Sequence, residues 1–183
     1  MNIPDLKTAD FLLTRVKAED SVDLFSIFKD KETMKFITPH PVTSLEQMEE
    51  KMAAIISLMR EGKEAAWIIR PTDNNEAAGL FRFHKIHKWH QKAEMNAVLS
   101  PVYQNSGVMT QILPRVLSFG FEELKLNRIA GDIFIENQGS RRLLEKNGFH
   151  CDGILRQTDF DGERFYDTAV YSILRDEYLW SEI

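Results

Sequence analysis

The fold is decided by a polar stretch between a predicted strand and a predicted helix, Leu99-Ser100-Pro101-Val102-Tyr103-Gln104-Asn105-Ser106-Gly107-Val108-Met109-Thr110. The first N–H groups of a helix have no partner inside the helix and lie at the positive end of its dipole, so this junction suits an anion such as a pyrophosphate. Gly107 would let phosphate oxygens approach the main chain. We therefore expect a diphosphate group to bind the backbone between Gln104 and Thr110.

Two common nucleotide-binding motifs do not fit this stretch. A P-loop ends in Gly-Lys-Ser/Thr, and no such triplet closes the segment. A dinucleotide-binding turn needs several glycines, and only Gly107 is present. The stretch therefore indicates a different anion-binding fold.

The residues before the stretch alternate in the manner of β-strands. A hairpin is predicted from Ala66–Arg70 and Ala78–Phe83 around the polar turn at 73–75, followed by a third strand at Ala93–Leu99. An earlier strand is predicted at Phe11–Val16. Successive strands with short connections predict an antiparallel meander.

Helical periodicity marks three further segments of the first two thirds. A helix is expected after Glu19-Asp20-Ser21, and another after Ser44, whose Ser44-Leu45-Glu46-Gln47 pattern is typical of a capping box. Its methionines are expected in the core. A third helix is predicted from Met109 to Leu124, with a bend near Pro114, because proline removes one backbone hydrogen bond.

The last third predicts a strand, a short helix and a hairpin. The strand is Arg128–Ile135, the helix Ser140–Lys146 is stopped by Asn147-Gly148, and the hairpin runs from Gly153 to Leu174 around Asp161-Gly162. The whole chain predicts an α/β fold with a mixed sheet. We expect one domain over residues 1–183.

Composition limits the class of protein. The chain is 43% apolar and 28% charged with a net charge of −5, which argues against a nucleic-acid partner because phosphate contacts need clustered Lys and Arg. No apolar run is long enough for a membrane span, and the N-terminus lacks signal-peptide order. We expect a cytoplasmic protein. The single cysteine, Cys151, is expected to be a small buried apolar residue.

Longer motifs make the chain similar to a known family. Gln104-x-x-Gly107-x-Met109 resembles the acetyl-CoA signature of the GNAT superfamily of N-acetyltransferases. The segments that follow resemble its RimJ/RimL-like branch, which acetylates ribosomal-protein N-termini. They are Phe119 to Ile129, Glu136-Asn137-Gln138-Gly139-Ser140-Arg141-Arg142-Leu143-Leu144-Glu145-Lys146-Asn147-Gly148-Phe149, Gly153-Ile154-Leu155-Arg156, and Tyr166-Asp167-x-x-x-Tyr171-Ser172. Met109 replaces the small residue of the general motif, and Asn105 stands where many relatives carry glycine.

The resemblance implies a fold of about seven strands and four helices with two splayed central parallel strands, and acetyl-CoA as co-substrate without a metal. The pantetheine arm would lie between the strands Glu94–Leu99 and Arg128–Ile135, with the acyl oxygen near the main-chain N–H of Leu99 or Ser100. The implied cofactor-binding residues are Leu99, Gln104, Asn105, Ser106, Gly107, Val108, Met109, Thr110, Asn137 and Ser140.

The resemblance also implies catalytic roles. Ser140 matches the serine that protonates the leaving thiolate, with a helix N-cap as the alternative; Asn137 matches the asparagine that holds the pantetheine, with an Asx turn as the alternative. An ammonium must lose a proton before it attacks, and the base candidates are Asp159 and Glu94. Either carboxylate could instead be a solvated surface acid.

We expect acetyl transfer from acetyl-CoA to a primary amine, foremost a protein N-terminus, by direct attack in a ternary complex. Alternatives are a polyamine or aminoglycoside acetyltransferase and a non-catalytic acyl-CoA-binding module. The chain would act as a monomer or homodimer. Substrate contacts are expected from the loops at 36–45, 84–91 and 159–164. His84, His87 and His90 are not expected to bind a metal, since no further ligand is apparent.

Overall fold

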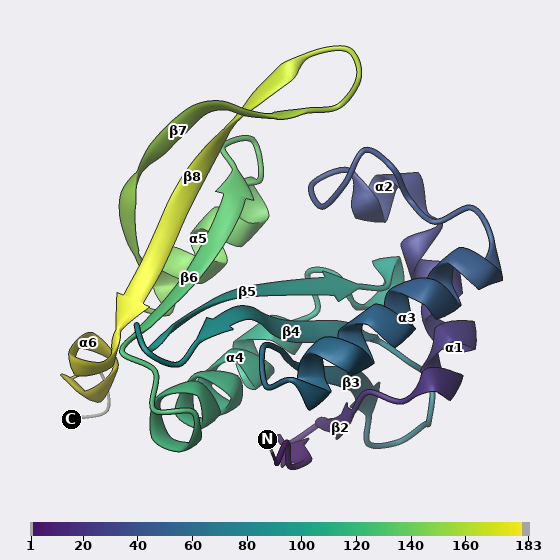
Figure 1. Cartoon of the computed structure of the whole chain (residues 1–183), viewed down its shortest axis with the longest axis horizontal. Coiled ribbons are helices and arrows are strands. Elements are labelled where there is room, and N and C mark those ends of the chain that lie inside the picture. Colours follow the sequence, from purple (N-terminus) through teal and green to yellow (C-terminus); the bar gives the residue numbers. More distant parts are fainter. Residues whose placement is uncertain (1, 181–183) are drawn as a thin grey trace.

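The computed structural model describes residues 2–180, which form one mixed sheet flanked by helices (Figure 1). The sheet has eight strands in the order β1-β2-β3-β4-β5-β6-β8-β7. The strands are β1 Leu6–Lys7, β2 Phe11–Arg15, β3 Ala65–Pro71, β4 Gly79–His87, β5 Lys92–Leu99, β6 Arg128–Phe134, β7 His150–Phe160 and β8 Phe165–Leu174. The helices are α1 Ser21–Phe28, α2 Lys31–Met34, α3 Leu45–Arg60, α4 Val108–Ser118, α5 Gln138–Lys146 and α6 Arg175–Trp180, with 3-10 turns η1 Ala18–Asp20 and η2 Pro101–Tyr103 and a π-turn η3 Phe119–Glu123.

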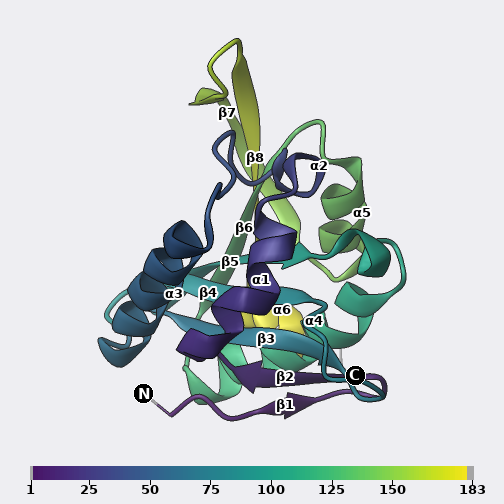
Figure 2. The same ribbon diagram turned by 90° about the vertical axis from the view of Figure 1, so that its right-hand side faces the viewer.

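Helices cover both faces of the sheet (Figure 2). On the first face, Arg70 of β3 reaches α1. On the opposite face, Trp67 packs edge-on against Phe119 with ring centroids 5.2 Å apart. Because side chains alternate along a strand, each strand presents one set of residues to α1 and α3 and the other set to α4 and α5.

The hydrophobic core fills the space between the sheet and the helices on both of its faces. Trp67, Phe81 and Phe83 are fully buried and meet edge-to-face, and the Trp67 indole N–H donates to the Pro4 carbonyl at 2.8 Å. The predicted antiparallel meander is confirmed, since β3, β4 and β5 pair antiparallel in sequence order. The α3 methionines Met48, Met52 and Met59 are buried as expected.

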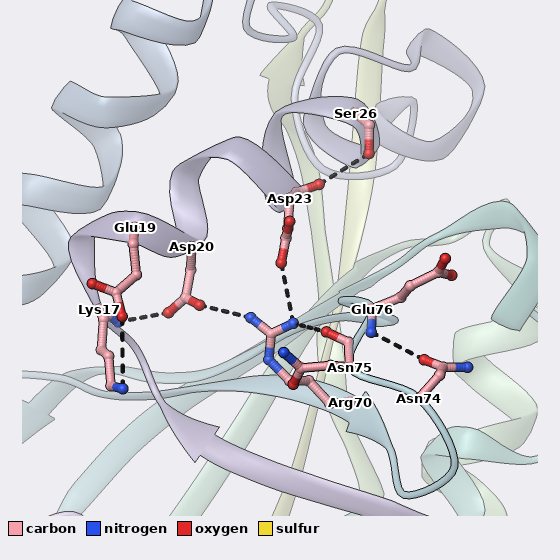
Figure 3. A network of polar contacts seen from close by, with 9 residues as sticks. All are labelled: Lys17, Glu19, Asp20, Asp23, Ser26, Arg70, Asn74, Asn75 and Glu76. Atoms are coloured by element: carbon pink, nitrogen blue, oxygen red, sulfur yellow. Dashed lines mark hydrogen bonds and ion pairs between the residues drawn. The ribbon is translucent and has the colours of Figure 1, made fainter.

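A polar network joins α1 to the end of β3 (Figure 3). The Arg70 guanidinium donates to Asp20 at 2.7 Å, to Asp23 at 3.1 Å and to the Asn75 carbonyl. The side chains of Arg70 and Asp20 are only 12% and 8% exposed. Sequence patterns did not predict this network, which fixes α1 against the sheet.

Helix starts agree with the predicted caps in one case and differ in another. The Ser44 hydroxyl accepts from the N–H of Gln47 and starts α3, but the Gln47 side chain accepts from Thr43 rather than completing the box with Ser44. Helix α5 begins at Gln138, two residues before the predicted start, because Asn137 rather than Ser140 supplies the cap.

The third predicted helix is divided in two. Helix α4 runs from Val108 through Pro114 to Ser118, and the chain then widens into the π-turn η3, where the N–H of Leu124 donates to the Phe119 carbonyl at 3.0 Å. A π-turn makes i→i+5 bonds, so the predicted helical period of 109–124 is broken after Ser118.

Strands β7 and β8 form the predicted hairpin, which projects beyond the rest of the sheet (Figure 1). The Asp161 carboxylate closes its turn by accepting from the N–H groups of Glu163 and Arg164. The prediction that Cys151 is buried is wrong: β7 is an edge strand and Cys151 is exposed on it. The sequence alone predicts that Trp180 is a packing residue, and its side chain lies outside the part of the chain that the structure describes.

No helix within residues 2–180 combines the length and the apolar character required to span a membrane.

Candidate functional site

The predicted anion-binding stretch is an open loop with free main-chain N–H groups. The N–H of Gln104 donates to the Pro101 carbonyl at 3.3 Å, and the next main-chain N–H found to donate to a carbonyl is that of Gln111, at 3.2 Å from the Gly107 oxygen. Within the described residues no partner is found for the main-chain N–H groups from Asn105 to Thr110. Asn105 and Gly107 are left-handed, with φ of 57° and 84°. Successive N–H groups in such a backbone form an anion-binding concavity.

The loop has open space beside Gly107. A Cβ placed on Gly107 would meet no atom within 4 Å. The side chains of Gln104 and Ser106 instead support the loop from below, donating to the carbonyls of Leu99 at 3.0 Å and Tyr103 at 2.7 Å. Val108 is buried and anchors the start of α4 in the core.

Next to this loop, two parallel strands diverge. Strands β5 and β6 pair only from Lys92 to Glu94 and from Arg128 to Ala130, although β5 continues to Leu99 and β6 to Phe134 (Figure 1). The outer edges of both strands stay paired, with β4 and β8. The facing edges beyond Glu94 and Ala130 therefore hold backbone groups that do not pair across the gap within residues 2–180.

Asn137 and Ser140 lie at the start of α5, just after β6. The Asn137 carboxamide oxygen accepts from the N–H of Ser140 at 3.1 Å. The alternative role of Asn137, a local turn residue, is thus present in the structure, whereas Ser140 is the third residue of the helix and not its cap. Among the described residues the Ser140 hydroxyl has no partner, so it is available to a ligand.

Three carboxylates gather on the α1/α3 face of the sheet. Glu94 is paired in register with His84 on one side and with Ala130 on the other. Asp132, two residues beyond Ala130, lies on the same face by strand alternation. Asp159 of β7 accepts from the Thr168 hydroxyl at 2.9 Å on the neighbouring strand β8.

Asp132 was missed by sequence reasoning. Burial raises the pKa of its carboxyl, and the negative charges of Glu94 and Asp159 act in the same direction, which places all three groups within electrostatic range. A signal for it existed: Asp132 is the one acid in the run from Ile129 to Phe134, whose other residues are apolar, and Asp is depleted in strands.

Glu94 is flanked by two basic side chains from β4. The Lys85 ammonium lies 2.7 Å from the Glu94 carboxylate, and His84 Nδ1 lies 4.0 Å from it. Burial, with the nearby Arg82 cation, lowers the pKa of His84 from 6.5 to about 4. His84 is therefore neutral at pH 7, and Lys85 supplies the positive charge beside Glu94.

Aromatic rings close this face above β6. Phe134 contacts Phe36, which follows α2, with centroids 6.5 Å apart, and stacks on Tyr166 of β8 at 5.1 Å. The Arg164 guanidinium lies 4.4 Å from the Tyr166 ring centre. Phe36 of the predicted loop at 36–45 thus contacts Phe134 directly, and Arg164 of the predicted loop at 159–164 covers the Tyr166 ring that stacks on Phe134.

The third predicted loop, at 84–91, is partly strand. His84 and His87 belong to β4, while the His87 and His90 rings lie 4.2 Å apart at the exposed turn. Between residues 2 and 180, no group of three His, Cys, Asp or Glu side chains is arranged to hold a metal ion.

The family model of the acetyltransferase (GNAT) domain matches residues 10–150. The chain belongs to this family of N-acetyltransferases, which confirms the resemblance of its motifs. A Bacillus subtilis (strain 168) protein named uncharacterized N-acetyltransferase YoaA is 31% identical over 172 residues, covering 94% of this chain and 97% of that protein.

Solved structures confirm the GNAT fold with its mixed sheet. RimL, named a ribosomal alpha-N-protein acetyltransferase, in complex with coenzyme A, has a TM-score of 0.88 at 21% identity and covers 95% of this chain and 99% of its own. A spermidine N-acetyltransferase from Vibrio cholerae in complex with CoA and spermine has a TM-score of 0.83 at 23% identity, covering 92% and 98%. The eight strands exceed the expected seven by the short β1, and the short α2 and α6 extend the expected four helices.

Proposed function

We propose that this chain transfers the acetyl group of acetyl-CoA to a primary amine, foremost the α-amine of a protein N-terminus. One observation carries the proposal: the free N–H groups of Asn105 to Thr110 open beside the divergence of β5 and β6. A diphosphate needs several donors, and an amide-bearing arm needs unpaired strand edges. Both lie next to one another here.

The residues present fit coenzyme A. The N–H groups from Asn105 to Thr110 would hold the diphosphate, and Gln104 would keep the loop in place through Leu99. Backbone groups near Leu99 would pair with the pantetheine, with Asn137 and Ser140 on the opposite side. When bound, the cofactor supplies an activated thioester.

The transfer requires a base and an acid from this chain. Asp159 or Glu94 takes a proton from the acceptor ammonium, directly or through water, and the freed amine attacks the acyl carbon. The N–C bond forms and the C–S bond breaks. The Ser140 hydroxyl would donate its hydrogen to the departing thiolate and regain one from the attacking nitrogen, directly or through water, so that the product is a neutral amide and no alkoxide remains.

Two acceptor classes have support. A protein N-terminus is supported by the overall likeness to RimL and by the projecting hairpin, where Ile154, Leu155, Phe160 and Phe165 are exposed and could contact a polypeptide. A polyamine is supported by the carboxylates Glu94, Asp132 and Asp159, which would hold several positive charges. We further propose that the chain works as a single cytoplasmic domain, as a monomer or homodimer.

A thiol-release assay with acetyl-CoA separates the acceptors. The panel contains one Ser-initiated peptide, the same peptide with a formylated N-terminus, and spermidine. Release with the free peptide but not with the formylated one supports N-terminal transfer, and release with spermidine alone supports the polyamine. Coenzyme A binding without release on any amine would contradict the proposed catalysis.

Variants test the catalytic assignments. Ser140→Ala and Asp159→Asn should slow the transfer while the affinity for coenzyme A, measured by calorimetry, stays nearly unchanged. A loss of affinity in either variant would show that the residue supports the fold instead.

A further inference from the structure

Lys85 lies at a backbone irregularity that turns its side chain toward the carboxylates Glu94 and Asp132 on the α1/α3 face of the sheet, here called the acceptor face. The register between β4 and β5 shifts between the pairs His84↔Glu94 and His87↔Lys92, so β4 contains one extra residue there. Lys85 is left-handed, with φ of 51°, which is uncommon for a side chain other than glycine. Such a bulge redirects a side chain relative to regular alternation.

The redirected ammonium contacts the carboxylate at the point of strand divergence. Its nitrogen lies 2.7 Å from Glu94, the last residue of β5 that pairs with β6. The Glu94 side chain is 29% exposed and that of Lys85 is 68% exposed. Lys85 therefore holds a partly buried acid from the solvent side.

The Lys85 ammonium also interacts electrostatically with Asp132 of β6. Burial and Glu94 raise the pKa of Asp132, and Lys85 opposes that rise, so its ammonium is within range of both carboxylates. No other cation is found within hydrogen-bond distance of Glu94 among the described residues.

We propose that Lys85 is a specificity-determining residue whose ammonium stands in for the acceptor's own, and which an incoming cationic amine must displace from Glu94. The inference rests on the proposed acetyl transfer to an amine. Lys85 then raises the KM of cationic acceptors, because each of them must break the ion pair between Lys85 and Glu94 in order to bind. Its long exposed stem lets it swing into solvent once displaced.

The expected change in KM follows from the solvent exposure of the Lys85–Glu94 ion pair. Exposed ion pairs contribute little free energy, and the partial burial of Glu94 places the Lys85–Glu94 pair at the upper end of that range. Removing Lys85 should therefore lower the KM for a cationic acceptor roughly two- to fivefold. The kcat should change less than the KM. Arginine keeps the charge and should keep the KM within about twofold.

The test compares Lys85→Met, Lys85→Arg and a matched control, Lys17→Met. Lys17 has the same 68% exposure, pairs with Glu19 at 3.7 Å, and follows β2, which is separated from β4 by β3 in the sheet. Acceptor KM and kcat are measured at saturating acetyl-CoA, and binding of spermidine and of the Ser-initiated peptide to the coenzyme A-saturated proteins is measured by calorimetry. Thermal melts verify that each variant folds.

Tighter amine binding and a lower KM in Lys85→Met alone support the inference. An unchanged or higher KM in Lys85→Met, with active wild-type protein, overturns it and leaves the proposed function intact. Coenzyme A binding with no thiol release in any variant overturns the proposed function. In that case the amine-binding calorimetry still tests Lys85: if wild type and Lys85→Met bind the amine equally, or if neither binds it, the inference is overturned as well.

Discussion

Replacing Gly107 with alanine tests the free-amide loop most directly. Gly107 is left-handed at φ 84°, and a new Cβ would meet no atom within 4 Å. The cost to folding is therefore conformational only, about 1–2 kcal/mol, or roughly 2–8 °C in Tm for a chain of this size. The methyl group would, however, project into the space where we place the diphosphate.

The expected loss of affinity follows from the donors involved. A hydrogen bond to a charged group contributes about 1.5–3 kcal/mol, so moving the diphosphate off a single N–H should weaken coenzyme A binding about ten- to a hundredfold. Dissociation constants are measured by titration calorimetry of wild type and Gly107→Ala.

Gly162 provides the matched control. It is also left-handed, at φ 103°, and an added Cβ there would also meet nothing within 4 Å, but it lies in the turn of the β7–β8 hairpin. Gly162→Ala should lose a similar amount of stability and keep its affinity. If both variants bind coenzyme A within twofold of wild type, the diphosphate does not contact this loop and the assignment is wrong.

Three further results are expected. Arg70→Met leaves the buried Asp20 carboxylate without its cation, with the Lys17 main-chain N–H as its remaining donor. This variant should cost about 3–5 kcal/mol, roughly 6–20 °C in Tm by calorimetry. Asp23→Asn, at a half-exposed partner of Arg70, should cost at most ~1 kcal/mol. Burial lowers the pKa of His84 from 6.5 to about 4, so between these pH values the unfolded chain binds more protons than the folded one. Denaturant unfolding should therefore show the free energy of unfolding falling by about 2 kcal/mol from pH 7 to pH 5. His84→Gln should remove this fall, and the same pH dependence in wild type and variant would contradict the assignment. In Ser140→Ala, kcat should fall with an unchanged dissociation constant for coenzyme A, and equal kcat would remove Ser140 from the acid role.

The parts of the fold that follow from local periodicity were predictable. The meander of β3, β4 and β5 and the helix α3 after Ser44 follow from alternation and capping, which a short window of sequence contains. The start of α5 was misplaced because Asn137 and Ser140 are both good caps, and only the backbone decides between them. The exposure of Cys151 depends on β7 being an edge strand, which is a property of the whole sheet.

The acceptor face shows why half of the site was not visible in sequence. Glu94 and Asp159 could be proposed from the sequence. Asp132 joins them only because β5 and β6, which have α4 between them in the sequence, pair in the sheet and diverge just beyond Glu94. Lys85 contacts Glu94 because of a β-bulge in β4, which the alternation of apolar and polar residues in the sequence does not predict. In the proposed function the acids would attract a cationic acceptor and Lys85 would compete with it. Acceptor choice would then depend on contacts that only the tertiary structure creates, whereas cofactor binding would depend on a loop that is contiguous in the sequence.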